Sequence, residues 1–228
     1  MKTEAPPLPA SPDAALRQVA PRRTQIERRT EAEARLLAAA REIVARKGWV
    51  GMTLAEVGET AGYSRGLAAH HFGSKPSLLR ALASHINDNF MRELDGGPQR
   101  RDGLDALLGF VQTYLGRSDE RWTNTRALLL LMAEASTDDS ETGEHLAIYN
   151  QRVLGFLEQH FHAGIANGDI RSDIDPASGA TVIVGALRGV LMQKLLKNSS
   201  INLDAVKKEL LSMMIRSFAR KPAKWLTH

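Results

Sequence analysis

The chain of 228 residues contains no cysteine, which excludes a disulfide framework, a thiol nucleophile and a thiolate metal site. Its longest charge-free run, which ends at Leu187, falls far short of the about 20 apolar residues that a membrane-spanning helix needs. The N-terminus also lacks the apolar core of a secretory signal. These absences predict a cytoplasmic protein with no membrane partner.

Catalytic and metal-binding motifs are missing as well. The sequence has no HExxH motif, no glycine-rich phosphate loop and no serine nucleophile elbow. His160 and His162 lie two residues apart, so they project from nearly opposite sides of a helix and do not converge on a metal. We therefore expect no enzymatic activity, no cofactor and no metal.

The positive charge of the chain is concentrated near its N-terminus. Residues 1–80 hold 13 Lys and Arg against 8 Asp and Glu, whereas residues 81–228 hold 17 against 18. A basic N-terminal module suits contact with phosphates, which dominate the affinity of proteins for nucleic acids.

The first 27 residues contain five of the nine prolines and few large apolar side chains. This composition predicts a disordered, basic and proline-rich tail over 1–27. Arg28 and Arg29 follow it, and such a basic arm is suited to lie in a minor groove or against phosphate. A tail that only keeps the protein in solution is the alternative.

The rest of the chain predicts an all-α fold of about nine helices. The expected ranges are 30–47, two short helices within 53–71, 75–94, 102–116, 120–136, 141–167, 176–197 and 203–219. Capping patterns mark starts at Thr30-x-x-Glu33 and Asp175-Pro176, and Asp95-Gly96-Gly97-Pro98 ends the fourth helix. No segment alternates with period two, so we expect no sheet.

The stretch from Thr53 to Lys75 carries its own start and stop signals. Thr53 and Glu56 form a capping-box pattern at the start of the first short helix. Gly62 is suited to the left-handed conformation that ends it, and Ser64 is suited to cap the second helix. Such a pair lays one helix across the DNA backbone and inserts the other into the major groove. This pattern predicts a helix-turn-helix.

This stretch resembles the TetR/AcrR family of helix-turn-helix transcriptional regulators. Helix 30–47, the run His71-Phe72-Gly73-Ser74-Lys75 and Leu78-Leu79 carry the same resemblance. The resemblance spans Thr30 to Leu82. It implies an N-terminal three-helix DNA-binding bundle at 28–75 and a C-terminal helical ligand-binding and dimerisation domain at 76–228. It further implies a homodimer that binds operator DNA and releases it when a small molecule enters the C-terminal domain.

Several residues of the helix-turn-helix are candidates for DNA contact. Arg65 stands in the first turn of the second short helix, where a guanidinium reaches guanine or phosphate. Free N–H groups at helix starts favour a phosphate beside Thr53 and Ser64, and Gly66 lets DNA approach the backbone. The resemblance also implies a phosphate-contacting Lys75.

The second short helix also carries His70, His71, Leu67 and Ala69. The resemblance favours His71 over His70 as a phosphate contact, and we expect one of the two to pack inward. Leu67 and Ala69 stand where the family often has Thr and Tyr, which removes two polar contacts. Leu67 is left to contact a thymine methyl, and the operator sequence cannot be inferred.

The C-terminal helices predict an interface and a pocket. Helix 176–197 is apolar nearly all round, so it must be buried on several sides. Together with helix 203–219 it suits a four-helix dimer interface, although a monomer core is the alternative. Candidate pocket residues are Tyr114, Trp122, Met132, Tyr149, Phe156 and Arg188. Each of the apolar ones fits plain core better than a ligand contact, and Arg188 fits the rim of a subunit interface equally well.

The leading hypothesis is a ligand-responsive transcriptional repressor. It binds palindromic double-stranded operator DNA as a dimer and is released by a small hydrophobic or aromatic effector. The alternatives are a transcriptional activator, or a helical small-molecule-binding protein or enzyme that has lost operator reading. Leu67 and Ala69 keep the second alternative open.

Overall fold

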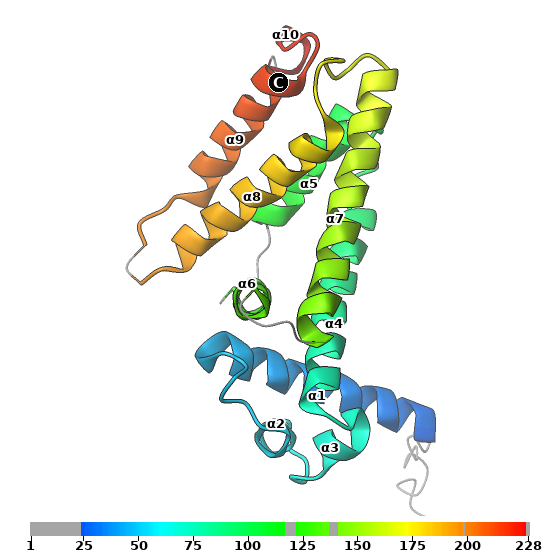
Figure 1. Ribbon diagram of the computed structural model, residues 1–228, viewed down its shortest axis with the longest axis vertical. Coiled ribbons are helices and arrows are strands. Elements are labelled where there is room, and N and C mark those ends of the chain that lie inside the picture. Colours follow the sequence, from blue (N-terminus) through cyan, green and yellow to red (C-terminus); the bar gives the residue numbers. More distant parts are fainter. Residues whose placement is uncertain (1–23, 117–121, 137–140, 198, 227–228) are drawn as a thin grey trace, which may run out of the picture.

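The computed structural model describes residues 24–116, 122–136, 141–197 and 199–226, and all regular elements in these ranges are helices (Figure 1). The helices are α1 Gln25–Lys47, α2 Leu54–Thr60, α3 Leu67–Phe72, α4 Lys75–Asp95, α5 Leu104–Gly116, α6 Thr123–Ala135, α7 Glu141–Ala166, α8 Pro176–Leu195, α9 Leu203–Phe218 and α10 Ala223–Leu226. This confirms the predicted all-α fold. The sequence does not predict α10, because four residues are too few to show a helical period.

Helix α1 begins earlier than the sequence predicts. Its N-cap is Thr24, whose side chain accepts a 3.2 Å hydrogen bond from the Glu27 backbone N–H, while the Glu27 carboxylate accepts one of 2.7 Å from the Thr24 backbone N–H. The expected start at Thr30 is therefore wrong, and residues 25–27, which we assigned to the tail, are helical. The rest of the tail, residues 1–23, lies outside the described residues.

The N-terminal bundle is built from α1, α2, α3 and the first turns of α4. Each of them contributes a fully buried side chain: Leu36 from α1, Val57 from α2, Ala68 from α3 and Leu79 from α4. A helix as short as α3 is not stable by itself, so packing on this core fixes its position.

Helix α4 belongs to both halves of the molecule. Figure 1 shows it rising from the bundle and running beside α7. Near its end the ring of Phe90 makes edge-to-face contacts with Phe110 and Tyr114 of α5, at centroid distances of 5.3 and 5.4 Å. One continuous helix therefore joins the bundle to the core of the C-terminal half.

The C-terminal half packs α8 along α7 and α9 against α5. Gly179 of α8 makes the first of these contacts close, because a Cβ at that position would lie 2.6 Å from the Phe161 ring on α7. Among the described residues, no helix combines the length and the apolar character needed to cross a membrane.

Candidate nucleic-acid interface

The turn between α2 and α3 depends on two glycines. Gly62 has φ +79°, the left-handed conformation that the sequence predicts for the end of the first short helix. Gly58 lies on the inner side of α2, where a Cβ would stand 2.5 Å from the Ser64 backbone oxygen. The absence of a side chain at Gly58 thus lets the turn fold back against α2 and sets the angle between the helices.

The capping of the two short helices differs in part from the prediction. The Thr53 side chain accepts a 3.2 Å hydrogen bond from the Glu56 backbone N–H, as predicted for the start of α2. Ser64 does not cap α3: that helix starts at Leu67, its N-cap is Gly66, and no side chain caps it. The turn therefore runs two residues longer than a cap at Ser64 would require.

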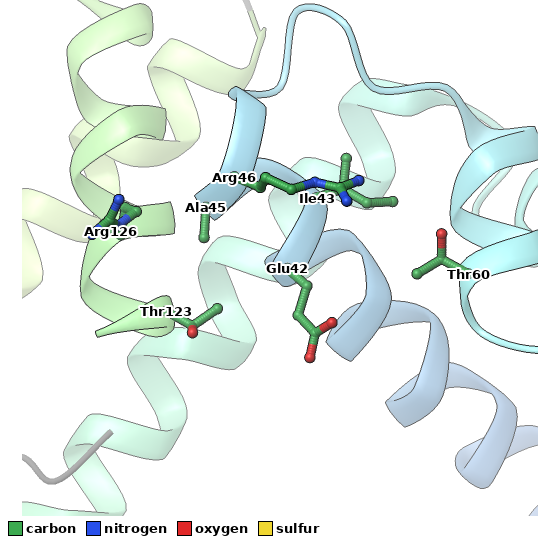
Figure 2. A pocket seen from close by; sticks show the side chains of 7 residues that line it. All are labelled: Glu42, Ile43, Ala45, Arg46, Thr60, Thr123 and Arg126. Carbon is green, nitrogen blue, oxygen red and sulfur yellow. The ribbon is translucent and has the colours of Figure 1, made fainter. Parts of the chain in front are cut away.

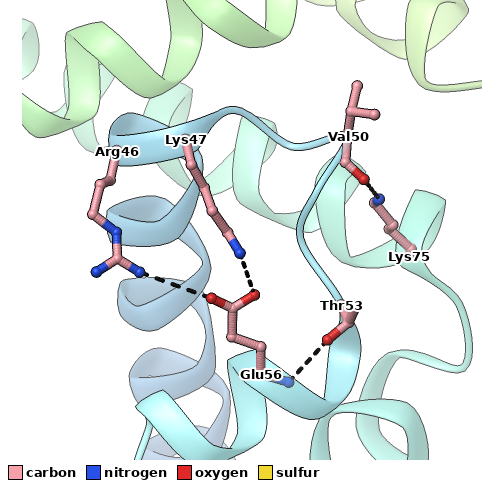
Figure 3. A network of polar contacts seen from close by, with 6 residues as sticks. All are labelled: Arg46, Lys47, Val50, Thr53, Glu56 and Lys75. Atoms are coloured by element: carbon pink, nitrogen blue, oxygen red, sulfur yellow. Dashed lines mark hydrogen bonds and ion pairs between the residues drawn. The ribbon is translucent and has the colours of Figure 1, made fainter.

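The Glu56 carboxylate fastens α2 to the end of α1. It accepts a 2.8 Å hydrogen bond from Lys47 Nζ and lies 3.8 Å from Arg46 Nη2 (Figure 3). The hydrogen bond from Lys47 is the main cause that lowers the pKa of Glu56 from its ordinary value. In the predicted capping box the Glu56 carboxylate would accept from the Thr53 backbone N–H. In the structure this carboxylate instead links α2 to α1.

The outer surface of the turn and of α3 carries exposed cationic and small side chains. The Arg65 side chain is 76% exposed, with its Nε 3.4 Å from Glu59 Oε1. Gly66, Ala69 and His70 are exposed, and Leu67 is half-buried. Among the described residues this guanidinium has one weak surface partner, so it is available to bind a base edge or a phosphate.

The two neighbouring histidines face opposite environments. The His71 side chain is only 10% exposed and its Nε2 lies 3.3 Å from Glu33 Oε2 of α1. The His71 ring also meets the Phe72 ring edge-on, at a centroid distance of 4.7 Å. His70 is exposed. One histidine therefore packs inward, as expected, but the geometry favours His70 over His71 as a DNA contact.

Lys75 is fixed by the loop that precedes α2. Its Nζ donates a 2.8 Å hydrogen bond to the Val50 backbone oxygen (Figure 3) and lies 5.2 Å from the centre of the Trp49 ring. Ser74 caps α4 by accepting a 3.2 Å hydrogen bond from the Ser77 backbone N–H. The start of α4, the exposed Thr53 and the exposed Val50 thus share one edge of the bundle.

Arg28 and Arg29 lie in the first turns of α1 and are exposed. The sequence places them at the end of a flexible arm, whereas the structure gives them helical backbone. Their contact with DNA stays a prediction, like the contacts of the other candidate residues.

Comparison with known proteins follows the same division of the chain. Residues 36–82 match the family described as bacterial regulatory proteins, tetR family, and residues 103–210 match the tetracyclin repressor-like C-terminal domain. The chain belongs to the TetR family of transcriptional regulators. The first match covers α2 and α3 in full, and the second covers the helices from α5 to α8.

Individual relatives of this TetR-family protein are distant. It is 27% identical over 167 residues to the HTH-type transcriptional regulator BetI of Rhizobium meliloti, covering 72% of this chain and 77% of BetI. It is 28% identical over 153 residues to the HTH-type transcriptional repressor AcnR of Corynebacterium diphtheriae, covering 62% of this chain and 71% of AcnR.

A solved structure of a Saccharomonospora viridis regulator in complex with choline shares the fold of this TetR-family protein. Its TM-score is 0.72 at 20% sequence identity, and the match covers 84% of this chain and all of the other. At this identity the likeness concerns the fold alone.

An aromatic cluster in the C-terminal half brings together two of the six predicted pocket residues. Tyr114 stacks on Phe110 at a centroid distance of 5.9 Å, and the Phe156 ring lies 6.0 Å from the Phe110 ring. Phe110 and Phe156 line a cavity of about 220 Å³, which the loop after α4 also borders. Sequence reasoning missed Phe90 and Phe110, whose complete burial was not visible from spacing.

The cavity also contains polar side chains. The His160 ring meets Phe156 edge-on at 4.6 Å, and its Nδ1 lies 3.6 Å from Asp102 Oδ1. Burial lowers the pKa of His160, and nearby Asp102 opposes that shift. Arg100 also lines the cavity and donates a 2.6 Å hydrogen bond to Gln112 Oε1.

Phe156 lines this cavity, whereas Tyr114 and the other four predicted pocket residues are not among the described residues that line it. Trp122 precedes α6 with φ 53°, and Met132 is half-buried on α6. Tyr149 is buried on α7. Arg188 is half-buried on α8, and its Nε atom is buried without a hydrogen bond in the described part of the chain. Their contact with a ligand stays a prediction.

A second cavity lies where the DNA-binding bundle meets α6. Its volume is about 430 Å³, and Figure 2 shows the lining side chains Glu42, Ile43, Ala45, Arg46, Thr60, Thr123 and Arg126. Across the same junction Arg41 Nη1 of α1 donates a 3.2 Å hydrogen bond to Asn124 Oδ1 of α6. The bundle is therefore held to the C-terminal half through α6 as well as through α4.

Proposed function

We propose that this TetR-family regulator is a dimeric repressor whose hold on a palindromic operator is released by a small hydrophobic or aromatic effector. The observation that carries the proposal is the path of α4. Its first residue, Lys75, is bonded to the loop before α2, and its later residue Phe90 packs in the aromatic cluster. A change around that cluster is thereby transmitted to the DNA-reading helices by one rigid element.

DNA is gripped by the exposed edge of the bundle. Arg65 and His70 provide donors on the reading helix and the turn before it, and Thr53 stands at the start of α2, where free N–H groups attract phosphate. Leu67 and the small Ala69 and Gly66 let this surface approach the groove closely. Because hydrogen-bond donors, among them the Arg65 guanidinium, remain on this surface, the loss of Thr and Tyr contacts does not by itself remove DNA binding.

The effector enters the cavity beside the aromatic cluster. Phe110 and Phe156 offer an apolar wall, while Arg100 and His160 offer polar groups that orient a ligand, which is the usual composition of a small-molecule pocket. A related fold binds choline in the Saccharomonospora viridis protein. For this chain we propose a molecule of similarly small size with an aromatic or aliphatic body.

Release follows from the different affinity of the effector for two conformations. A ligand that widens the space between Phe110 and Phe156 displaces the end of α4 against α5 and tilts the bundle at its other end. The shift in DNA affinity equals the preference of the effector between the two conformations, typically 5- to 150-fold.

The dimer forms through α8 and α9. Val182 is 62% exposed on α8 and Met213 is 52% exposed on α9, although both are large apolar side chains. Gly185 and Gly189 on the same side of α8 are exposed with open space above them, so a second helix can approach closely. A two-fold dimer presents two α3 helices to half-sites about 34–36 Å apart.

Repression is the direct consequence of such binding, because a dimer seated on a promoter excludes other proteins from the same DNA. The protein acts where the DNA lies, in the cytoplasm of a bacterial cell. An activator would bind the same operator, so reporter expression with and without the protein separates the two roles.

Footprinting on the DNA upstream of the protein's own coding sequence tests the proposal. The expected result is a protected palindrome with half-sites one helical turn apart, and loss of protection when the effector is added. Effector candidates are first identified by the rise in unfolding temperature that they produce, and Phe156→Ala is expected to abolish that rise. Uniform protection without a palindrome would contradict operator reading.

A further inference from the structure

A third cavity, which Arg126 also lines, lies between three helices. It has a volume of about 410 Å³ and is bordered by the C-terminal ends of α1 and α8 and by the middle of α6. Its wall is apolar and includes Leu129, Leu130 and Leu195. Met192 and Leu196 complete the wall, and they are 46% and 58% exposed. We refer to this cavity as the α1–α6–α8 groove.

Among the described residues that line the groove, the charged side chains are all cationic. They are Arg46, Lys47 and Arg126, and none of the lining residues in the described ranges is acidic. Arg46 and Lys47 are already engaged by the Glu56 carboxylate, at 3.8 and 2.8 Å. Arg126 is therefore the cation that is left to meet a ligand.

Arg126 lacks a partner among the described residues. Its Nε atom is buried and makes no hydrogen bond, and no carboxylate in the described ranges pairs with its guanidinium. A buried donor without an acceptor costs free energy, and an anion that accepts from it removes that cost. The planar guanidinium fits a carboxylate through two parallel hydrogen bonds.

We propose that the α1–α6–α8 groove is a second small-molecule site, which takes an amphiphilic carboxylate. The carboxylate is held by Arg126, with Arg46 and Lys47 adding positive potential, and the aliphatic or aromatic body lies on the wall formed by Leu130, Leu196 and their neighbours. A neutral or cationic amphiphile of the same length lacks this attraction. The charge of the lining selects the class of ligand.

This site goes beyond the effector cavity, from which it differs in position and in charge. The effector cavity is lined from α4, α5 and α7, whereas the groove is lined from α1, α6 and α8. A molecule in the groove contacts the DNA-binding helix α1 directly. It therefore joins the bundle to the C-terminal half and favours the arrangement of the two halves seen here.

Decanoate is a suitable probe, compared with decyltrimethylammonium and decanol below their micelle concentrations. Binding to the full chain is measured by isothermal titration calorimetry. We expect decanoate to bind with one site per chain, Arg126→Gln to weaken it by about tenfold or more, and the cationic probe not to bind. Arg100→Gln, which removes an arginine from the effector cavity, is the matched control and is expected to leave decanoate binding unchanged.

A second variant guards against an effect of Arg126 on folding. Leu196 is exposed, so Leu196→Asp leaves the core intact while it places a negative charge in the groove, and we expect it to weaken decanoate as well. Equal affinity in the wild type and Arg126→Gln, a loss confined to Arg100→Gln, equal binding of the cationic probe, or no binding to the wild type would each overturn the proposal. None of these results depends on whether the protein binds an operator.

Discussion

Lys75 Nζ donates a 2.8 Å hydrogen bond to the Val50 backbone oxygen and so ties the first turn of α4 to the loop between α1 and α2. The same ammonium lies over the Trp49 ring, 5.2 Å from its centre. Lys75 is thus part of the folded bundle before any DNA is present. A phosphate would meet a charge whose position is fixed in advance.

Lys75→Met tests both roles of this residue. It keeps the aliphatic stem and removes the hydrogen bond, so the free energy of unfolding should fall by about 1 kcal/mol, measured by urea denaturation. If Lys75 also contacts phosphate, the slope of log affinity against log salt should fall by about 1. Lys221→Met, at an exposed site far from the bundle, is the control, and equal behaviour of the two variants would contradict the role of Lys75.

Gly58→Ala should damage the turn between α2 and α3. The added Cβ would stand 2.5 Å from the backbone oxygen of Ser64, which cannot move without displacing the turn. We expect a loss of about 1–3 kcal/mol in the free energy of unfolding, together with weaker DNA binding.

Gly66→Ala is the matched comparison, since a Cβ at Gly66 meets open space and the backbone φ there is −84°. Its stability should stay within about 0.5 kcal/mol of the wild type. If DNA approaches Gly66 closely, its DNA affinity alone should fall. A Gly58→Ala protein as stable as Gly66→Ala would show that the close approach is not needed.

His160 should make the protein less stable in mild acid. Burial lowers the pKa of His160 in the folded state below its ordinary value of 6.5, so the unfolded chain binds a proton more readily. The stability that neutral His160 provides is therefore complete above about pH 7 and falls as the pH drops below 6.5. Urea midpoints at pH 7.5 and 5.5 should differ more for the wild type than for His160→Gln, and an equal difference would remove His160 as the cause.

Val182→Glu should convert the dimer into a folded monomer. The side chain is exposed in the single chain, so the charge is tolerated until a partner buries it. Light scattering coupled to size exclusion gives the mass of each form. Ile148→Glu changes an equally apolar and exposed site on α7 and should stay dimeric. Two variants of identical mass would argue against α8 as the interface.

Local signals predicted the helix-turn-helix well, because they depend on residues a few positions apart. The Thr53 cap and the left-handed Gly62 are of this kind. The start of α1 was harder to predict, because capping-box patterns begin at both Thr24 and Thr30. The structure shows that the residues between them are helical, so the helix begins after Thr24. The start of α3 at Leu67 could not be predicted, because no single residue of the turn indicates how long the turn is.

Contacts between distant segments could not be predicted in the same way. Which of His70 and His71 faces inward is decided by Glu33 on another helix. The aromatic cluster was predicted only in part. Helical spacing places Tyr114 and Phe156 on the inner sides of their helices, but it does not show that both pack on Phe110. The cationic groove at Arg126 joins three helices that are far apart in the sequence.

The most direct test of the account is the affinity of the dimer for its own upstream DNA, measured by fluorescence anisotropy for the wild type and for Arg65→Ala. The Arg65 side chain is 76% exposed and its contact is a weak surface pair with Glu59, so the variant should fold and dimerise normally. We predict sequence-dependent binding by the wild type and a loss of about 10- to 100-fold in Arg65→Ala, while Arg171→Ala at the opposite end of the molecule binds normally. Equal affinities for all three proteins, or no preference of the wild type for any upstream sequence, would contradict DNA reading by the surface around α3.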